Sequence, residues 1–253
     1  MTDKKNYLEN VDFINMNQNM LDHIMKQAKQ MMWSMVEYKE MQMLYNCAMK
    51  EIKTKLEILS TEFNIKHKRN PISSINSRLK RNESIIRKLT KLNVPFTIKS
   101  IEENLNDVAG IRVVCSYIDD IYTIAEALLK QDDIKLIIKK DYIKNPKPNG
   151  YRSLHLIISV PVFLENSKKE VKVEVQIRTI AMDFWSSLEH QIKYKKSIPN
   201  PDELGKQLLE CADVINKTDE KMLTLRKEIE AIENKEDSDE ILFQRLSNLD
   251  MPF

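Results

Sequence analysis

Polar and apolar side chains alternate strictly between residues 173 and 178, in the order Val-Glu-Val-Gln-Ile-Arg. Alternation of this kind is typical of a β-strand whose two faces meet different surroundings. One face is apolar, and the other presents an acid, an amide and a guanidinium, namely Glu174, Gln176 and Arg178. Such a face is either the solvated side of an edge strand or part of a functional site, and the strand alone does not decide between them.

A second group of polar side chains follows the Asn149-Gly150 pair, which predicts a turn. Beyond this turn, alternation places Tyr151, Ser153 and His155 on a common side. The ring of Tyr151 offers a flat surface for a nucleobase, and such stacking contributes about 1–3 kcal/mol per base. The competing interpretation is an ordinary packed tyrosine beside a turn.

Asp107 lies where a predicted helix is followed by a predicted strand, just before Gly110. A carboxylate at such a junction either projects into a cleft or belongs to the helix end or a turn. Mg²⁺ is usually bound by one or two carboxylates, with water and substrate phosphate oxygens as its other ligands. Asp107 and Glu174 together would therefore suffice as the protein's share of a magnesium site.

Any bound phosphate groups would have to be held by side chains, because glycine is scarce. Gly110, Gly150 and Gly205 form neither of the glycine-rich phosphate-binding patterns GxxxxGK[ST] and GxGxxG. The basic stretch from residue 78 to residue 91 is a candidate for this role, although a charged run on a helix is more often a solvated face.

Several helices and strands must bring these residues together. Helical periodicity without Pro or Gly predicts one or two long helices over residues 6–60, and Pro71 interrupts the polar residues 61–77 that follow. A basic helix is expected to begin near Glu83 or Ser84. The other predicted elements are a helix at 100–109, strands at 111–117, 135–143, 154–163 and 172–179, and helices at 119–131, 180–196 and 201–234.

This order of elements predicts an α/β (α+β) fold with a mixed β-sheet, flanked by N- and C-terminal helices. We expect a helical arm at residues 1–60, a catalytic domain at 61–200, and a C-terminal helix and tail at 201–253.

The composition indicates a globular protein, since 42% of the 253 residues are hydrophobic. No apolar run approaches the roughly 20 residues of a membrane-spanning helix, and the first residues lack the pattern of a secretory signal, so a cytoplasmic location is expected. The net charge of +2 does not indicate a general nucleic-acid-binding surface. Three widely spaced cysteines suggest neither a disulfide framework nor a zinc site.

Four motifs follow one another along the chain. They are Arg78-x-Lys80 with Ser84-Ile85 and Lys88, then LNDVAGIRVV at 105–114, DYIKNPKPNGYRSLH at 141–155 and VEVQIRTIAMDFWSSLEH at 173–190. Together they resemble the synthetase domain of the RelA/SpoT homologue family, and in particular its single-domain members, the small alarmone synthetases. The resemblance implies a nucleotidyltransferase-like fold and transfer of the β,γ-pyrophosphate of ATP to the 3′-hydroxyl of GDP or GTP, which yields AMP and the alarmones ppGpp or pppGpp.

On the ATP side, the resemblance implies that Arg78 and Arg112 enclose the adenine. Lys80 and Lys88 would neutralise the phosphates, close to a helix start that Ser84 helps to shape.

Between the two nucleotides, the resemblance implies that Asp107 holds Mg²⁺. Glu174 would complete the metal site or accept the proton of the 3′-hydroxyl. On the acceptor side, Tyr151 would stack on guanine. The other residues that would line the GDP or GTP are Lys147, Asn149, Ser153, His155, Gln176 and Arg178.

None of the four histidines is followed by Asp, so the metal-dependent hydrolase of the large family members is not expected. Some small synthetases form tetramers through their terminal helices, and the helical arms here suit a homo-oligomer, with a tetramer suspected. Two other function classes stay open, a non-enzymatic RNA- or nucleotide-binding module and a related nucleotidyl- or phosphotransferase with another acceptor. RNA is a possible partner in that sense, but the charge balance does not indicate it.

Overall fold

The computed structural model describes residues 2–67, 69–193 and 201–236. It contains two compact units, one made of Met1–Cys47 and Arg81–Leu105 and the other of Ala48–Lys80 and Asn106–Phe253. None of the helices in the described residues combines the length and apolar character needed to cross a membrane. The predicted fold class is confirmed, whereas the domain boundaries at residues 60 and 200 stay a prediction.

The smaller unit is helical. Ile85, Leu89 and Ile101 are buried in it, and Tyr38 donates a hydrogen bond of 2.7 Å to Asn82 Oδ1. The predicted basic helix is confirmed, with its buried residues on one side and its charged residues exposed on the other. The helices are α1 (Thr2–His67), which also extends into the larger unit, α2 (Asn82–Leu92) and α3 (Ile98–Asn104).

The larger unit is built on a mixed five-stranded sheet with the strand order β1-β2-β5-β4-β3. β2 and β5 are parallel, and the other neighbouring pairs are antiparallel. The strands are β1 (Ile72–Leu79), β2 (Ala109–Cys115), β3 (Lys135–Asp141), β4 (Leu154–Phe163) and β5 (Lys168–Thr179).

The alternation predicted for residues 173–178 is present in β5. Val173, Val175 and Ile177 are fully buried, whereas Glu174 and Gln176 are half-buried on the opposite face. The helix α4 (Ile118–Leu129) packs against β2 and β5. The apolar face of β5 thus belongs to the core, and its polar face is available for chemistry.

The strand β1 was not predicted from the sequence, which indicated only a polar stretch at residues 61–77 interrupted by Pro71. The helix α1 continues to His67, and Ile72–Leu79 forms an edge strand paired with β2. Only Ile72 of this strand is buried. Because its side chains pack so little, the strand has no hydrophobic alternation that the sequence could reveal, and its backbone pairing with β2 holds it in place.

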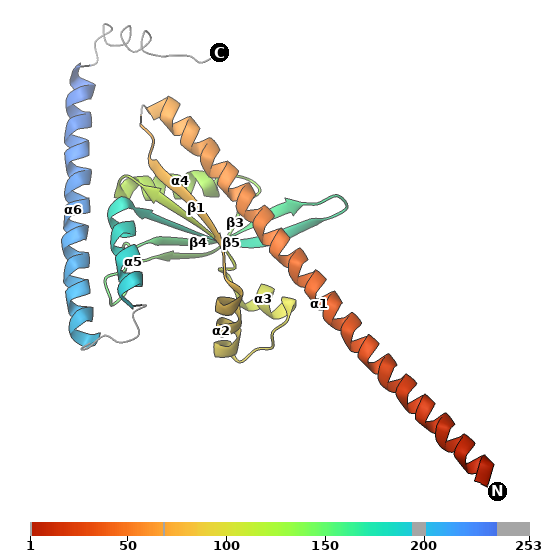
Figure 1. Ribbon diagram of the computed structural model, residues 1–253. Helices are drawn as coiled ribbons and strands as arrows, with labels where there is room; N and C mark the ends of the chain where they lie inside the picture. The colour runs from red at the N-terminus through yellow and green to blue at the C-terminus, as the bar shows by residue number, and fades with distance from the viewer. Residues whose placement is uncertain (1, 68, 194–200, 237–253) are drawn as a thin grey trace. The chain divides into compact units, whose positions relative to one another are not determined.

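Two helices, α5 (Ile180–Lys193) and α6 (Pro201–Glu236), lie side by side in the larger unit (Figure 1). Trp185 Nε1 of α5 donates a hydrogen bond of 2.9 Å to the carbonyl of Leu208 on α6. Thr179 at the end of β5 donates one of 2.6 Å to the buried Asp219 of α6. These bonds fix α6 to both β5 and α5.

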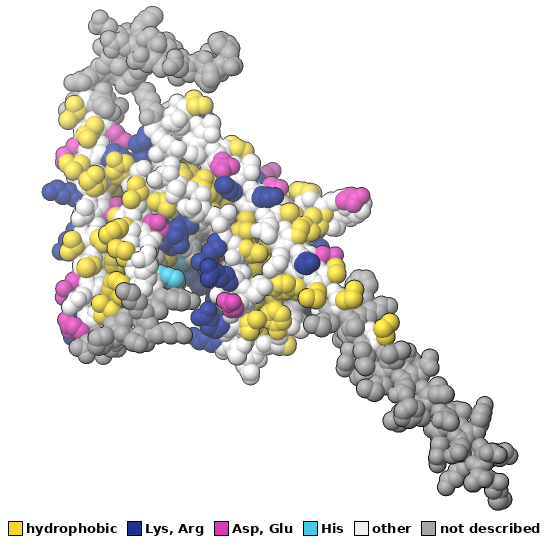
Figure 2. All heavy atoms as spheres, in the orientation of Figure 1, with side chains coloured by type: hydrophobic (Ala, Val, Ile, Leu, Met, Phe, Trp, Pro, Cys, Tyr) yellow, Lys and Arg dark blue, Asp and Glu magenta, His cyan; other side chains and the backbone are white. Residues whose placement is uncertain are grey.

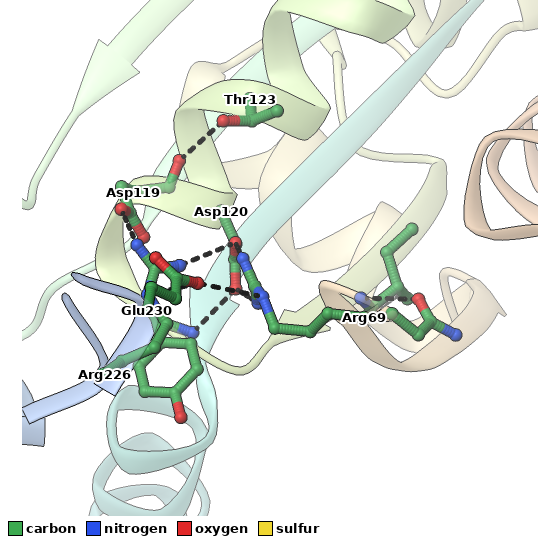
Figure 3. Close-up of polar contacts among 9 residues, drawn as sticks. Arg69, Asp119, Asp120, Thr123, Arg226 and Glu230 are labelled. Carbon is green, nitrogen blue, oxygen red and sulfur yellow. Dashed lines mark hydrogen bonds and ion pairs between the residues drawn. The ribbon is translucent and has the colours of Figure 1, made fainter. Parts of the chain in front are cut away.

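An ion-pair cluster holds α6 to the start of α4 (Figure 3). Arg69 binds both oxygens of Asp120, at 2.6 and 2.7 Å, and Arg226 of α6 binds Asp119 at 2.5 Å. The Tyr117 ring lies beneath both guanidinium groups, at 5.4 and 4.9 Å. The hydrogen bonds to Asp120 raise the pKa of Arg69 despite partial burial. The cluster therefore joins three segments that are distant in sequence.

Candidate active site

A cavity of about 870 Å³ lies within the larger unit, on the polar face of β5. This volume is at the upper end of the range of roughly 300–1,000 Å³ that is typical of ligand pockets. Figure 2 shows Lys and Arg side chains and a His side chain around a hollow on this face. The cavity is lined by Asn76, Ser77, Arg78, Lys80, Asp107, Gly110, Ile111, Arg112, Lys147, Asn149, Tyr151, His155, Glu174, Gln176, Arg178, Ser186, Glu189 and His190.

Strand register arranges the floor of the cavity in rows. In one row, Asn76, Arg112, Gln176 and His155 are paired across β1, β2, β5 and β4. Because paired residues on neighbouring strands project to the same face, these four side chains point into the same space. The sheet thus brings together residues that are up to 100 positions apart in sequence.

The next row contains Arg78, Gly110 and Glu174. Gly110 leaves the middle of this row without a side chain, so the space between the guanidinium and the carboxylate stays open. Asp107, two residues before β2, lies at the same end of the cavity. Its Oδ2 accepts a hydrogen bond of 2.7 Å from Lys80 Nζ. A cation and two carboxylates therefore meet around an open space, which suits the binding of a metal ion together with phosphates.

Five side chains form a closed ring of hydrogen bonds in the cavity. Glu174 Oε1 lies 3.2 Å from His155 Nδ1, and His155 Nε2 lies 2.8 Å from the Tyr151 hydroxyl. Arg178 donates to that hydroxyl at 3.0 Å and to Gln176 Oε1 at 2.7 Å. Gln176 Nε2 closes the ring with a bond of 2.9 Å to Glu174 Oε2. The donors and acceptors match if His155 donates from Nδ1 and accepts at Nε2.

This ring affects the protonation of two of its members. Burial alone would raise the pKa of Glu174, but the hydrogen bonds from His155 and Gln176 lower it below its usual value. Burial raises the pKa of Tyr151, against the opposing effect of the Arg178 charge. At neutral pH the ring therefore contains an ionised Glu174 and a protonated Tyr151 hydroxyl.

Asp183, in the first turn of α5, connects the two sides of the cavity. Its Oδ1 lies 3.3 Å from Arg178 Nη1 and 3.4 Å from Arg112 Nη1. Arg178 is almost fully buried, with 2% of its side chain exposed, and burial lowers its pKa. The shared carboxylate offsets the repulsion between the two guanidinium groups.

The loop at residues 144–153, which we name the acceptor loop, forms one wall of the cavity. Lys147 Nζ lies over the rings of Tyr142 and Tyr151, at 4.6 and 4.7 Å from their centroids. Asn149 Nδ2 donates a hydrogen bond of 3.1 Å to Glu189 Oε1 on α5. The ring of Tyr151 and the hydrogen-bonded pair of Asn149 and Glu189 thus belong to the same wall of the cavity.

Eleven of the fourteen site residues predicted from the sequence line this cavity. Ser153 does not, because it is fully buried and its hydroxyl donates to the carbonyl of Ile177. Ser84 and Lys88 lie on α2 in the smaller unit, and their predicted contact with ATP phosphates stays a prediction. The eleven lining residues are Arg78, Lys80, Asp107, Arg112, Lys147, Asn149, Tyr151, His155, Glu174, Gln176 and Arg178.

Sequence reasoning missed one helix face. Ser186, Glu189 and His190 line the cavity at a spacing of three and four residues, which places them on one side of α5. That polar spacing was visible in the sequence but was not distinguished from a solvated helix face. Asn76 and Ser77 were missed for another reason, because the strand that carries them was not predicted.

Comparison with known proteins gives three related findings. A family model described as "Region found in RelA / SpoT proteins" matches residues 77–199, so the match ends before α6. GTP pyrophosphokinase YwaC of Bacillus subtilis is 46% identical over 196 residues, which cover 78% of this chain and 93% of the relative.

Solved structures of small alarmone synthetases also resemble this chain. The small alarmone synthetase 2 from Bacillus subtilis is 45% identical, with a TM-score of 0.68 over 76% of this chain and 98% of the other. The small alarmone synthetase 1 from the same organism, bound to its product pppGpp, is 34% identical, with a TM-score of 0.67 over 73% of this chain and 94% of the other.

Proposed function

The chain belongs to the small alarmone synthetases of the RelA/SpoT family and is a GTP pyrophosphokinase, and we propose that its cavity transfers the β,γ-pyrophosphate of ATP to the 3′-hydroxyl of GDP or GTP. The observation that carries this proposal is the meeting of two carboxylates, a set of cationic side chains and an aromatic ring in one cavity. Phosphoryl-type transfer needs positioning and charge stabilisation more than covalent chemistry, and these residue types provide both.

On the ATP side, Arg78 and Arg112 project from β1 and β2 and would enclose the adenine. Lys80, whose side chain is 11% exposed, would contact the transferred phosphates. Its ion pair with Asp107 holds its ammonium beside the carboxylate of another residue that lines the cavity. Arg78 and Arg112 are planar cations, which suit stacking on a base as well as contact with phosphate.

On the acceptor side, Tyr151 would stack on guanine. Because Lys147 lies over the same ring, the base would displace the lysine or use the opposite ring face. A displaced Lys147 would be close enough to meet the nucleotide phosphates. Asn149 and Glu189 would contact the polar edge of the base, since an amide and a carboxylate can satisfy its acceptors and donors.

Mg²⁺ fits the two carboxylates, and we propose that Asp107 and Glu174 hold it. The described residues contain no group of three or more His, Cys, Asp or Glu side chains arranged for a metal. Mg²⁺ does not require one, because water and substrate phosphates usually complete its ligand set. The lowered pKa of Glu174 keeps that ligand ionised at neutral pH. When bound, Mg²⁺ supplies charge stabilisation on the phosphate oxygens.

In the reaction, the 3′-oxygen of the acceptor forms a bond to the β-phosphorus of ATP, and the bond between that phosphorus and the α,β-bridging oxygen breaks. AMP leaves with the bridging oxygen, and the hydroxyl proton must pass to a base. Glu174 is the candidate base, but its lowered pKa makes it a weak one. Its fixed position in the ring suits orientation of the hydroxyl or of the metal at least as well.

The test is incubation with ATP, MgCl₂ and GTP or GDP, followed by chromatographic separation of the nucleotides. We expect AMP and a 3′-pyrophosphorylated guanosine in equal amounts. Binding of nucleotides without turnover would instead support the non-enzymatic module, and AMP formed with a different acceptor would support another transferase. The family assignment favours neither alternative.

Assembly and location complete the proposal. We propose a homo-oligomer, with a tetramer as the specific expectation. The support is a row of exposed apolar side chains on α6, which a monomer would leave in water. The cytoplasmic location expected from the sequence stays a prediction. The large apolar side chains of this row are Val214, Met222, Leu225, Ile229 and Ile232.

A further inference from the structure

The acceptor loop contacts α6 through its backbone. Gly150 is buried and has a φ of +86°, a conformation that residues with a side chain rarely adopt. A Cβ atom at this position would lie only 2.4 Å from Ala212 Cβ and 3.3 Å from Leu209 Cδ1. The absence of a side chain at Gly150 and the small side chain of Ala212, which is 4% exposed, therefore allow the loop and the helix to touch.

An ion pair beside this contact links the same two segments. Arg152 Nη1 donates a hydrogen bond of 3.2 Å to the Gly150 carbonyl, and its Nη2 donates one of 3.3 Å to Asp213. The Arg152 side chain is 15% exposed, so its position is well defined by these contacts. One guanidinium thus joins the loop backbone to the helix residue that follows Ala212.

The helix is itself fixed to the elements that carry the rest of the cavity. Asp219 is bonded to Thr179, the residue after Arg178 on β5. The carbonyl of Leu208 is bonded to Trp185 of α5, the helix that also provides Glu189. Helix α6 consequently contacts β5, α5 and the acceptor loop, all of which carry residues of the same site.

We infer that α6 sets the position of the acceptor loop, with Ala212 and Asp213 as positioning residues for binding of the guanine nucleotide. This inference rests on the proposed function, in which Lys147, Asn149 and Tyr151 of that loop hold GDP or GTP. None of the ATP-side residues on β1 and β2 depends on this contact. A disturbance of the contact should therefore change guanine-nucleotide affinity and leave ATP affinity unchanged.

The first experiment is steady-state kinetics of Ala212→Leu, with the KM values for GTP and ATP measured separately. Overfilling a packed contact shifts the backbone, and we expect the KM for GTP to rise by about tenfold with the KM for ATP changed by less than about twofold. Ala231→Leu, an exposed site on the same helix, is the matched control and should match wild type. Equal changes in both KM values, or none, would overturn the inference.

The second experiment changes the contact between Gly150 and Ala212 with smaller substitutions. It therefore tests the inference even if Ala212→Leu folds poorly. Gly150→Ala should raise the KM for GTP through both strain and the clash with Ala212. Adding Ala212→Gly removes the clashing Cβ, so the double variant should recover part of the affinity lost in Gly150→Ala. Strictly additive effects of the two substitutions would show that the contact does not position the loop.

Direct binding separates this inference from the proposed function. If wild type makes no pyrophosphorylated guanosine, the proposed function fails, and titration calorimetry with GDP still compares the variants. Weaker GDP binding by Ala212→Leu than by Ala231→Leu would support the role of α6 even then. Equal GDP binding by these two variants would refute it.

Discussion

Substitution of Asp183 by Asn tests whether one carboxylate links the two nucleotide sides of the cavity. The change removes the negative charge that lies 3.3 Å from Arg178 and 3.4 Å from Arg112. A hydrogen bond between charged groups typically contributes about 1.5–3 kcal/mol. Both contacts here are long, and Asp183 is 27% exposed, so solvent screening reduces the expected loss to about 1–2 kcal/mol.

Two measurements follow from that magnitude. The midpoint of thermal unfolding should fall by about 2–8 °C, because a domain of this size loses about 2–4 °C per kcal/mol. The KM values for ATP and GTP should both rise, each by about two- to fivefold, since Arg112 belongs to one side and Arg178 to the other. Asp132→Asn, at an exposed position between α4 and β3, is the matched control. If Asp183→Asn raised only one of the two KM values, the proposed link would be wrong.

Three further predictions concern the carboxylates and the aromatic ring. Glu174→Gln and Asp107→Asn should each lower turnover by about 100-fold or more without changing the circular dichroism spectrum; near-normal turnover in either would remove that residue from the mechanism. Tyr151→Ala should raise the KM for GTP by about tenfold, through lost stacking, with the KM for ATP unchanged; an effect on ATP alone would misplace the acceptor. Burial raises the pKa of Asp219 above its ordinary value of 3.8. The folded state therefore binds this proton more tightly than the unfolded state does, and the stability of the fold falls as pH rises from 3.8 through the folded-state pKa. Asp219→Asn keeps an acceptor for Thr179 and should be more stable than wild type at pH 7 in thermal unfolding, and a less stable variant would contradict this sign.

The parts of the fold that the sequence revealed are those in which burial controls the pattern. The strand β4 has the predicted bounds, Leu154–Phe163, because its apolar run lies in the interior of the sheet, between β5 and β3. The polar face of β5 was equally visible, since strict alternation separates Glu174 from the core. In both strands the hydrophobic effect imposes a periodicity that can be read without coordinates.

The parts that the sequence concealed depend on contacts across the chain. Asp183 has no distinctive spacing, and its importance arises from the approach of Arg112 and Arg178 to one oxygen. The contact of Gly150 with Ala212 is hidden for the same reason, although the Asn-Gly pair correctly predicted a turn. Register and helix packing create these relations, and neither is encoded in local propensity.

The two sides of the site differ in how they are held. Arg78, Arg112 and Glu174 project from paired strands, whose register fixes their separations. Tyr151 instead belongs to a loop whose position depends on α5 and α6, yet its hydroxyl is joined through His155 to Glu174. Movement of Tyr151 on binding the acceptor would therefore change the hydrogen bonding of the catalytic carboxylate. Because this connection runs through the loop, substitutions that alter acceptor choice should also alter kcat, whereas substitutions on the ATP side can change the KM for ATP alone.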